Sequence, residues 1–247
     1  DDSSLLAHSS VGHTSSRRRG NCEKETENMI KYTPTVSSFT QLKVTGDFEV
    51  SFDMGDSLSV EVKVDSGLKE YVDVSVTGDV LSISFKPDMP CTDIDEEPEI
   101  KIVSPKFLSS ITASADAQVQ FPGWPFQLSP EIEATTGSLS LMASGAQIDV
   151  KKLAATSIDV NVKDKGKVDL QWTTADTVTI AASSDGRVEG GTTKTLKIDA
   201  SSDAEVKFKV TSSATGSVTS DAKFKYEGGG DVSGVTTSDG GKVKYDD

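Results

Sequence analysis

Histidine, arginine and long apolar runs are scarce in this sequence of 247 residues. The two histidines, His8 and His13, lie near the N-terminus, so the rest of the chain lacks the side chain most used for proton transfer and zinc binding. The formal net charge is −14, which argues against a nucleic-acid-binding role, because such binding depends on neutralising phosphates with Lys and Arg. No stretch approaches the length of apolar sequence that a membrane-spanning helix needs, so no transmembrane segment is expected.

Only two cysteines occur, Cys22 and Cys91, and their spacing fits no zinc motif. They are either a disulfide in an exported protein or two unrelated buried thiols. The even number in a chain rich in Ser and Thr favours the disulfide, and a bridge closing so long a loop contributes about 4 kcal/mol in the chain-entropy treatment. No signal peptide is visible at Asp1, so the chain is either a mature form or a protein that is never exported.

Motifs for catalysis and cofactor binding are also missing. The run Gly228-Gly229-Gly230 is not followed by the Lys-Ser/Thr of a phosphate-binding loop. β-Helical polysaccharide lyases combine basic residues with calcium-binding acids, whereas Arg187 is the only arginine in the second half of the chain. We therefore expect a protein that is not an enzyme and has no cofactor or bound metal.

The most specific pattern present is an internal repeat. Residues 113–121 read ASADAQVQF, and residues 200–208 read ASSDAEVKF. A Ser/Thr-Ser-Asp-Gly/Ala pattern recurs, and its aspartates are separated by one constant interval, at Asp185, Asp203, Asp221 and Asp239. Such a fixed interval indicates a repeat architecture rather than a catalytic motif.

From Phe39 onward, apolar residues alternate with polar ones, as in strands that bury one face. Gly46-Asp47 and Gly78-Asp79 separate the runs and are typical of turns. One short repeat with two strands cannot bury its own apolar face, but stacked repeats can. We predict an all-β protein, a parallel β-helix or β-solenoid with coils of about 18 residues. An antiparallel sandwich is the alternative, but it does not require a fixed interval.

Three segments are expected along the chain. Residues 1–35 are serine-rich and of low hydrophobicity, which predicts a disordered or extended tail. Residues 36–107 form a β-rich N-terminal portion that continues into the solenoid, and residues 108–247 form the repeat solenoid itself.

The four repeated aspartates form a predicted turn ladder. On adjacent coils they lie about 4.8 Å apart and repel by roughly 0.9 kcal/mol per neighbouring pair in water. Either each carboxylate caps its own turn by accepting a backbone N–H, or a row of calcium ions bridges them. Because the turns lack the Gly-Gly-x-Gly-x-Asp spacing of calcium-binding solenoids, capping is the favoured interpretation. Lys207, Lys225 and Lys244 are expected to form a parallel basic row.

An aromatic, proline-containing segment, Phe121-Pro122-Gly123-Trp124-Pro125-Phe126, interrupts the repeats. Exposed aromatic side chains commonly contact carbohydrate or protein, which makes Trp124 and Phe126 candidate ligand contacts. The favoured interpretation is structural: the loop folds back and covers part of the solenoid.

The order of these motifs resembles the head GIN domain family of bacterial auto-transporter adhesins. The opening strand pair F-x-x-L/I-x-V-x-G-x-F-x-V stands at residues 39–50, and G-x-L-x-I is similar to residues 78–83. A P-x-L-x-x-I-x-x-S-G-A segment corresponds to residues 105–117, and Ser144-Gly145-Ala146 keeps the family's turn. The resemblance covers about Phe39 to Tyr245. It implies a β-helical protein that is secreted or exposed on the cell surface, with a structural or adhesive role and no catalytic residues.

Three expectations about partners follow. A secreted or surface adhesin would bind an extracellular glycan or a matrix protein, and a carbohydrate-binding module using the aromatic loop or an outer face is the alternative function. The repeats continue to Val243-Lys244-Tyr245, so the last coil offers an open strand edge. We expect head-to-tail self-association there, in which the basic residues 17–19 of one copy meet the acidic Asp246-Asp247 of the next.

Overall fold

A computed structural model describes residues 25–26, 28–90, 94–121 and 135–246, all of which belong to an all-β fold. The described residues form 18 strands joined in one large sheet, with a single short 3-10 turn, η1 (Lys69–Tyr71). The prediction of an all-β protein is confirmed, and the sheet is mixed, because parallel and antiparallel pairs both occur. The described parts of the chain contain no helix with the length and hydrophobicity that a membrane crossing requires.

The strands of the first half of the chain coincide with the alternating runs of its sequence. They are β1 (Met29–Tyr32), β2 (Gln41–Thr45), β3 (Glu49–Met54), β4 (Ser59–Asp65), β5 (Val72–Thr77), β6 (Val80–Phe85), β7 (Glu99–Ser104), β8 (Ser110–Ser114) and β9 (Gln118–Phe121). In β2 and β3, for example, Leu42, Val44, Val50 and Phe52 are buried and their neighbours are less so.

The second half of the chain contains longer strands, three of which bend and continue. The strands are β10 (Thr135–Ser144), β11 (Gln147–Lys151), β12 (Ala154–Lys163), β13 (Lys167–Ala182), β14 (Arg187–Ala200), β15 (Glu205–Val218), β16 (Lys223–Glu227), β17 (Asp231–Thr237) and β18 (Lys242–Tyr245). The N-terminal and C-terminal parts of β13, β14 and β15 pair with different neighbours or in different registers.

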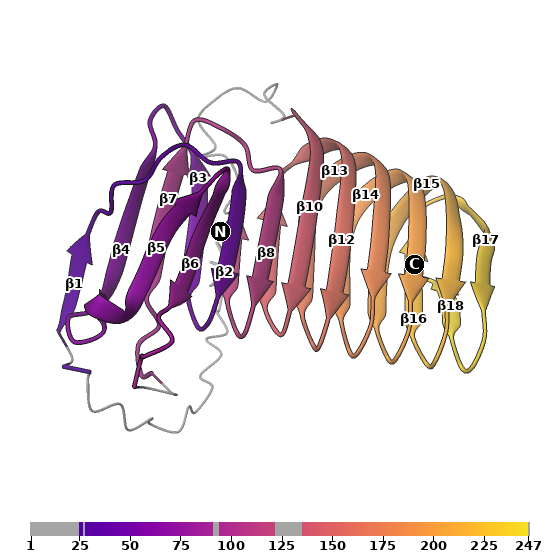
Figure 1. Cartoon of the computed structure of the whole chain (residues 1–247). Coiled ribbons are helices and arrows are strands. Elements are labelled where there is room, and N and C mark those ends of the chain that lie inside the picture. The colour runs from indigo at the N-terminus through magenta and orange to yellow at the C-terminus, as the bar shows by residue number, and fades with distance from the viewer. Residues whose placement is uncertain (1–24, 27, 91–93, 122–134, 247) are drawn as a thin grey trace, which may run out of the picture.

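The strands lie in two rows, here called ladders (Figure 1). The first ladder runs β5-β6-β2-β8-β10-β12, then through the C-terminal parts of β13, β14 and β15, to β17. The second ladder runs β1-β4-β7-β3-β9-β11, then through the N-terminal parts of the same three strands, to β16 and β18. From β6 onward the chain alternates between the two ladders, so each segment in the first is followed by one in the second.

The register of the parallel pairs brings like residues into columns. Val168, Val188, Val206 and Phe224 are successive partners in the second ladder, and all four are fully buried. The first step along this column spans more sequence than the next two, because the segment between Leu170 and Thr174 is longer than its partner segment. The buried residues of both ladders form one continuous apolar core, since a side chain on every second position points inward.

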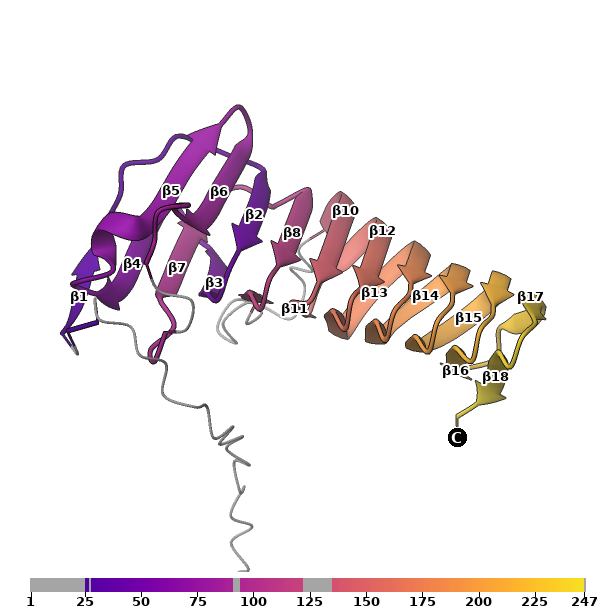
Figure 2. The ribbon, with the colours of Figure 1, turned by 60° about the horizontal axis from the view of Figure 1, so that its bottom comes forward.

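The N-terminal end of the sheet departs from this parallel arrangement. β5 pairs antiparallel with β6, while β4 pairs antiparallel with both β7 and β1 (Figure 2). The pair β6–β7 lies outside β2–β3, although it comes later in the sequence. Within the range predicted as a tail, Met29–Tyr32 is strand β1, because Ile30 and Tyr32 pack against the core.

Candidate functional site

The repeated aspartates lie at the turn edge, the row of tight turns through which the chain passes from the first ladder to the second. Each of three turns closes through a backbone N–H of its fourth residue: Gly186 to Ser183 (3.0 Å), Ala204 to Ser201 (3.2 Å) and Ala222 to Thr219 (3.1 Å). Both central residues have positive φ, for example 54° at Ser202 and 63° at Asp203. Tight turns with two positive φ angles favour Asp, Asn and Gly, which explains why the repeat keeps an aspartate there.

Neighbouring turns are tied together by their backbones. The backbone N–H of Asp185 donates to the carbonyl of Ser202. In the same way, the N–H of Asp203 donates to the carbonyl of Ser220, and the N–H of Asp221 to the carbonyl of Asp239. The nitrogen–oxygen distance is 3.0 Å in all three. The side chains of Asp185, Asp203 and Asp221 are exposed. No cluster of three or more His, Cys, Asp or Glu suited to a metal ion occurs among the described residues. That the carboxylates cap their turns, rather than bind calcium, stays a prediction.

Asp239 occupies a different place in its turn from the other three aspartates. It is the first central residue, followed by Gly240, because the turn closes from Gly241 to Ser238 (2.9 Å). The partner segment of β15 is shorter than β17 at this point, since Ser213 pairs with Asp231 but Thr215 pairs with Gly234. Gly240 is therefore the positional equivalent of Asp221, which the constant sequence interval concealed.

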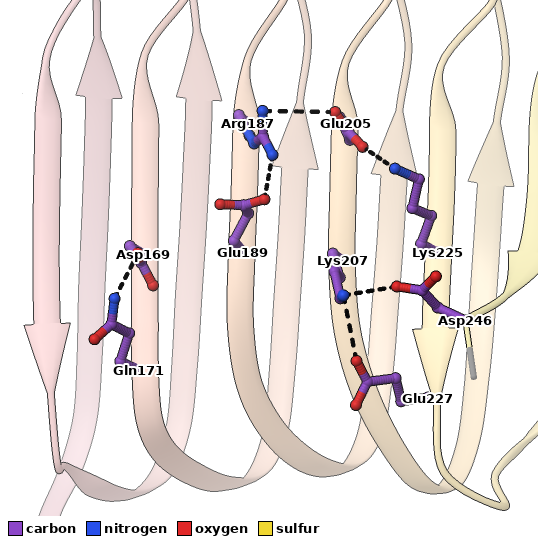
Figure 3. A network of polar contacts seen from close by, with 9 residues as sticks. All are labelled: Asp169, Gln171, Arg187, Glu189, Glu205, Lys207, Lys225, Glu227 and Asp246. Carbon is purple, nitrogen blue, oxygen red and sulfur yellow. Dashed lines mark hydrogen bonds and ion pairs between the residues drawn. The ribbon is translucent and has the colours of Figure 1, made fainter. Parts of the chain in front are cut away.

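A charged network covers the outer face of the second ladder across β14, β15 and β16 (Figure 3). The Arg187 guanidinium lies against Glu189 of its own strand and 3.8 Å from Glu205 of the next. Glu205 accepts a hydrogen bond from Lys225 of the strand after that. These contacts link three successive strands by side chains in addition to the backbone ladder.

The predicted basic row is part of the same face. Lys207, Lys225 and Lys244 are in-register partners on β15, β16 and β18, as the sequence indicated. The Lys207 ammonium lies 2.6 Å from Asp246 and 3.4 Å from Glu227. Acidic side chains thus contact this row, and it is not a free cationic surface.

Glu205 should make stability depend on pH. The hydrogen bond from Lys225, with Arg187 nearby, holds the pKa of the Glu205 carboxyl below its ordinary value. A lowered pKa in the folded state means that the contribution is present above the ordinary Glu pKa and is lost as the pH falls through the folded value. We expect Glu205→Gln to cost about 1 kcal/mol at pH 7 and much less at pH 3 in urea unfolding. The control is Asp203→Asn, and a cost for Glu205→Gln that is equal at both pH values would contradict the assignment.

Asp65, at the end of β4, is an enclosed acidic group that anchors the N-terminal segment. Its side chain is almost fully buried, and its carboxylate accepts the N–H groups of Thr26 (3.0 Å), Asn28 (3.1 Å) and Gly67 (2.7 Å). Burial raises the pKa of Asp65, but the three N–H donors stabilise the charged form and hold the pKa below its ordinary value.

Asp65→Asn should loosen strand β1. Hydrogen bonds to a charged acceptor contribute about 1.5–3 kcal/mol, and an Asn amide offers only one acceptor oxygen to these three donors. We expect a loss of about 2 kcal/mol in the free energy of unfolding and faster hydrogen exchange at residues 29–32. Asp88→Asn, at an exposed position, is the matched control. Unchanged exchange in β1 would show that the anchor is not needed.

Two hollows lie on the N-terminal part of the sheet. One, of about 650 Å³, is bordered by the Tyr32 ring, the Lys69 ammonium 5.0 Å from its centroid, and Lys86. The other, of about 240 Å³, is lined by charges that pair with one another, including Lys31 with Glu61 at 2.8 Å. The first has the size of a small-ligand site, and the second is a surface of neutralised ions.

Trp172 is a prominent surface residue that the sequence analysis did not single out. It lies in β13 at the corner edge, where the chain returns from the second ladder to the first, and it is 73% exposed. Its φ is 53°, a conformation that costs a bulky residue about 1–2 kcal/mol. The Lys152 ammonium lies 6.0 Å from its ring centroid. The sequence did contain a signal for it, because Trp172 is a large aromatic residue at the point where the apolar–polar alternation ending at Leu170 breaks.

Several predicted site residues fall outside the described residues. They are Cys22, Cys91, Trp124 and Phe126, together with residues 17–19. The disulfide, the aromatic ligand contact and the basic end of the self-association interface stay predictions.

The two ladders around one apolar core define an all-β domain, and comparison with solved structures finds proteins that share this fold. A "putative adhesin" from Bacteroides fragilis is 18% identical, with a TM-score of 0.74, over 89% of this chain and 98% of that one. A "putative lipid binding protein" from Parabacteroides distasonis is 13% identical, with a TM-score of 0.65, over 93% and 99%. A "putative adhesin" from Parabacteroides merdae is 16% identical, with a TM-score of 0.62, over 90% and 98%. At these identities the likeness concerns the fold.

The family is established by the sequence profile rather than by these structures. The profile described as "Putative auto-transporter adhesin, head GIN domain" matches residues 38–230. The chain belongs to this family, as the resemblance in the sequence indicated. Comparison with curated proteins returned no match.

Proposed function

We propose that this chain is a non-enzymatic structural and adhesive module of a secreted or cell-surface protein, built as a β-solenoid. The observation that carries the proposal is the register of the outward-facing residues. Ser140, Asp159, Thr179, Lys197 and Thr215 are successive partners across five strands of the first ladder, and all lie on its outer face. Such columns form a large, regular polar surface that suits contact with an extended partner.

The solenoid part of the proposal rests on the pairing pattern. From β8 onward every ladder pair between described strands is parallel, and the successive partners are about 20 residues apart once the repeats begin. One strand in each ladder, one turn and one corner then make one coil. On this proposal, residues 36–107 open the solenoid, residues 108–247 form its regular coils, and the turn edge and corner edge are its two long sides.

The location and the partner follow from the same proposal. The family description names adhesins, which supports an extracellular or cell-surface site and a glycan or matrix protein as partner. A Cys22–Cys91 disulfide and head-to-tail association of copies belong to this proposal. In an oxidising environment the bridge would join the N-terminal segment to the loop before β7.

The adhesive role is tested with the purified chain coupled to fluorescent beads. We expect the beads to attach to bacterial or animal cell surfaces, or to immobilised matrix proteins, above beads that carry the heat-unfolded chain. Attachment should be competed by free folded protein. Equal attachment of folded and unfolded chains to every surface would reject the proposal.

A carbohydrate-binding module is the second candidate, through the loop with Trp124 and Phe126 or through an outer face. The observation that favours it is Trp172, whose large aromatic surface is held out into solvent. Aromatic side chains presented in this way are suited to stacking against sugar rings. This candidate predicts that a defined polysaccharide competes with bead attachment.

A further inference from the structure

The position of Trp172 on the corner edge is unusual on both of its sides. Lys152 occupies the same corner position in the preceding strand pair, since Lys151 pairs with Gln171 and Ala154 with Thr174. Both residues have positive φ, 56° and 53°, which stacks their side chains so that the ammonium lies over the indole. A cation over one face of a tryptophan ring is attractive and fixes the orientation of the ring.

The next corner is shorter and has no side chain to cover the indole. Leu170 pairs with Gly190 and Thr174 with Thr192, so the segment Gln171 to Thr173 faces the single residue Gly191. A Cβ on Gly191 would lie 2.6 Å from Cζ of Phe208, whose buried ring fills the space beneath. The glycine is therefore required by packing, and the corner edge has a step beside Trp172.

The exposed indole of Trp172 therefore lies beside the bare backbone of Gly191. The indole is 73% exposed although Lys152 lies over it, so much of its surface is free for contact. Residues held in a sparsely populated backbone conformation cluster at functional sites such as ligand clamps. A glycine at this position would avoid both the strain and the exposed apolar area.

We propose that Trp172 is a stacking platform for one pyranose ring of a neutral glycan, with Lys152 as the residue that orients the indole. The apolar face of a pyranose matches a flat, exposed indole, and its equatorial hydroxyls reach outward to water. The net charge of −14 disfavours a polyanionic chain, and the Lys152 ammonium over the indole would repel a cationic sugar, so the ligand is neutral. This inference rests on the carbohydrate-binding candidate above and assigns it a site on the corner edge.

The test uses intrinsic fluorescence, because Trp124 and Trp172 are the only tryptophans. In a Trp124→Phe background, emission reports on Trp172 alone. The probes are soluble neutral polysaccharides (mannan, xyloglucan, laminarin and hydroxyethyl cellulose), with polygalacturonate and phosphatidylcholine vesicles as the other arms. We expect at least one neutral polysaccharide to shift or quench the emission, with little change between low and high salt.

Affinity electrophoresis of the full chain with that polysaccharide separates the site from the fold. Trp172→Asn should weaken binding at least tenfold without lowering the melting temperature, since Asn tolerates positive φ. Met142→Ala removes another exposed apolar side chain, 41% exposed on β10, and should leave binding within twofold.

Three outcomes would overturn the inference: no response to any neutral polysaccharide, a response only to polygalacturonate or to vesicles, or unaltered binding by Trp172→Asn. If bead attachment persists in Trp172→Asn while no neutral glycan binds, the platform is rejected and the adhesive function stands. If attachment fails with the wild-type chain but the glycan binds, the adhesive function is rejected and the platform stands.

Discussion

Gly216→Ala should destabilise the protein by about 2–5 kcal/mol, a large effect for the addition of one methyl group. Gly216 lies in β15 with φ of 131°, which an L-residue adopts only with strain. A Cβ built there would lie 1.8 Å from the carbonyl oxygen of Ile198 on β14. The obstacle is backbone that belongs to the ladder, so it cannot move aside without breaking the pairing of β14 with β15.

The measurement is chemical denaturation of the Gly216→Ala variant against wild type. Gly137→Ala is the matched control, because a Cβ at that strand position meets no atom within 4 Å and its φ is not in the left-handed region. We expect the control to lie within about 0.5 kcal/mol of wild type. If both variants unfolded at the same denaturant concentration, the close approach of β14 and β15 would be refuted.

Phe208→Ala should cost about 3–5 kcal/mol, the range for truncating a buried phenylalanine. The ring is 2% exposed on β15, and its Cζ fills the space under Gly191 of the preceding strand pair. Its removal leaves a cavity under Gly191, which has no side chain to fill it. Tyr245→Ala, at a ring that is 48% exposed, is the control and should cost far less. Similar losses in the two variants would mean that the core between the ladders is not tightly packed there.

The local elements were predictable because alternation is a local property. The apolar residues at every second position in Leu42–Val44 and in Phe48–Phe52 predicted two strands with one buried face, and β2 and β3 occupy those positions. The turns at Asp185, Asp203 and Asp221 were visible for a similar reason, since only a few residue types accept two positive φ angles in succession.

Long-range pairing was not predictable from the sequence pattern. Nothing in the alternation of β6 and β7 distinguishes a place outside β2–β3 from a place after it, because all these runs have the same period. Strand β1 lies within the predicted tail. It was not predictable from local sequence, because the segment is anchored by Asp65, which lies far beyond Tyr32 in the chain, and not by a motif of its own.

Candidate-site residues were harder to predict than the strands. Asp239 keeps the constant interval of the repeat, but the extra residue in β17 makes it the first central residue of its turn, where the other aspartates are the second. The sequence interval alone cannot detect such a shift. Trp172 has no repeated counterpart, so a search for repeats passes over it, although its exposure depends on the shorter corner of the following repeat.

The position of β2–β3 between β6–β7 and β8–β9 has a consequence for the order in which the chain is assembled. Leu42 of β2 meets Leu81 on one side and Ile111 on the other, and both partners come much later in the chain. In the later part of the sheet each strand and its next partner are separated by only about 20 residues of sequence. Because closing a longer loop has a larger entropic cost, we expect the part from β2 to β9 to form slowly, and only after most of it has been synthesised. Once it exists, each new segment adds to a template that is already in place, at a nearly constant cost per addition.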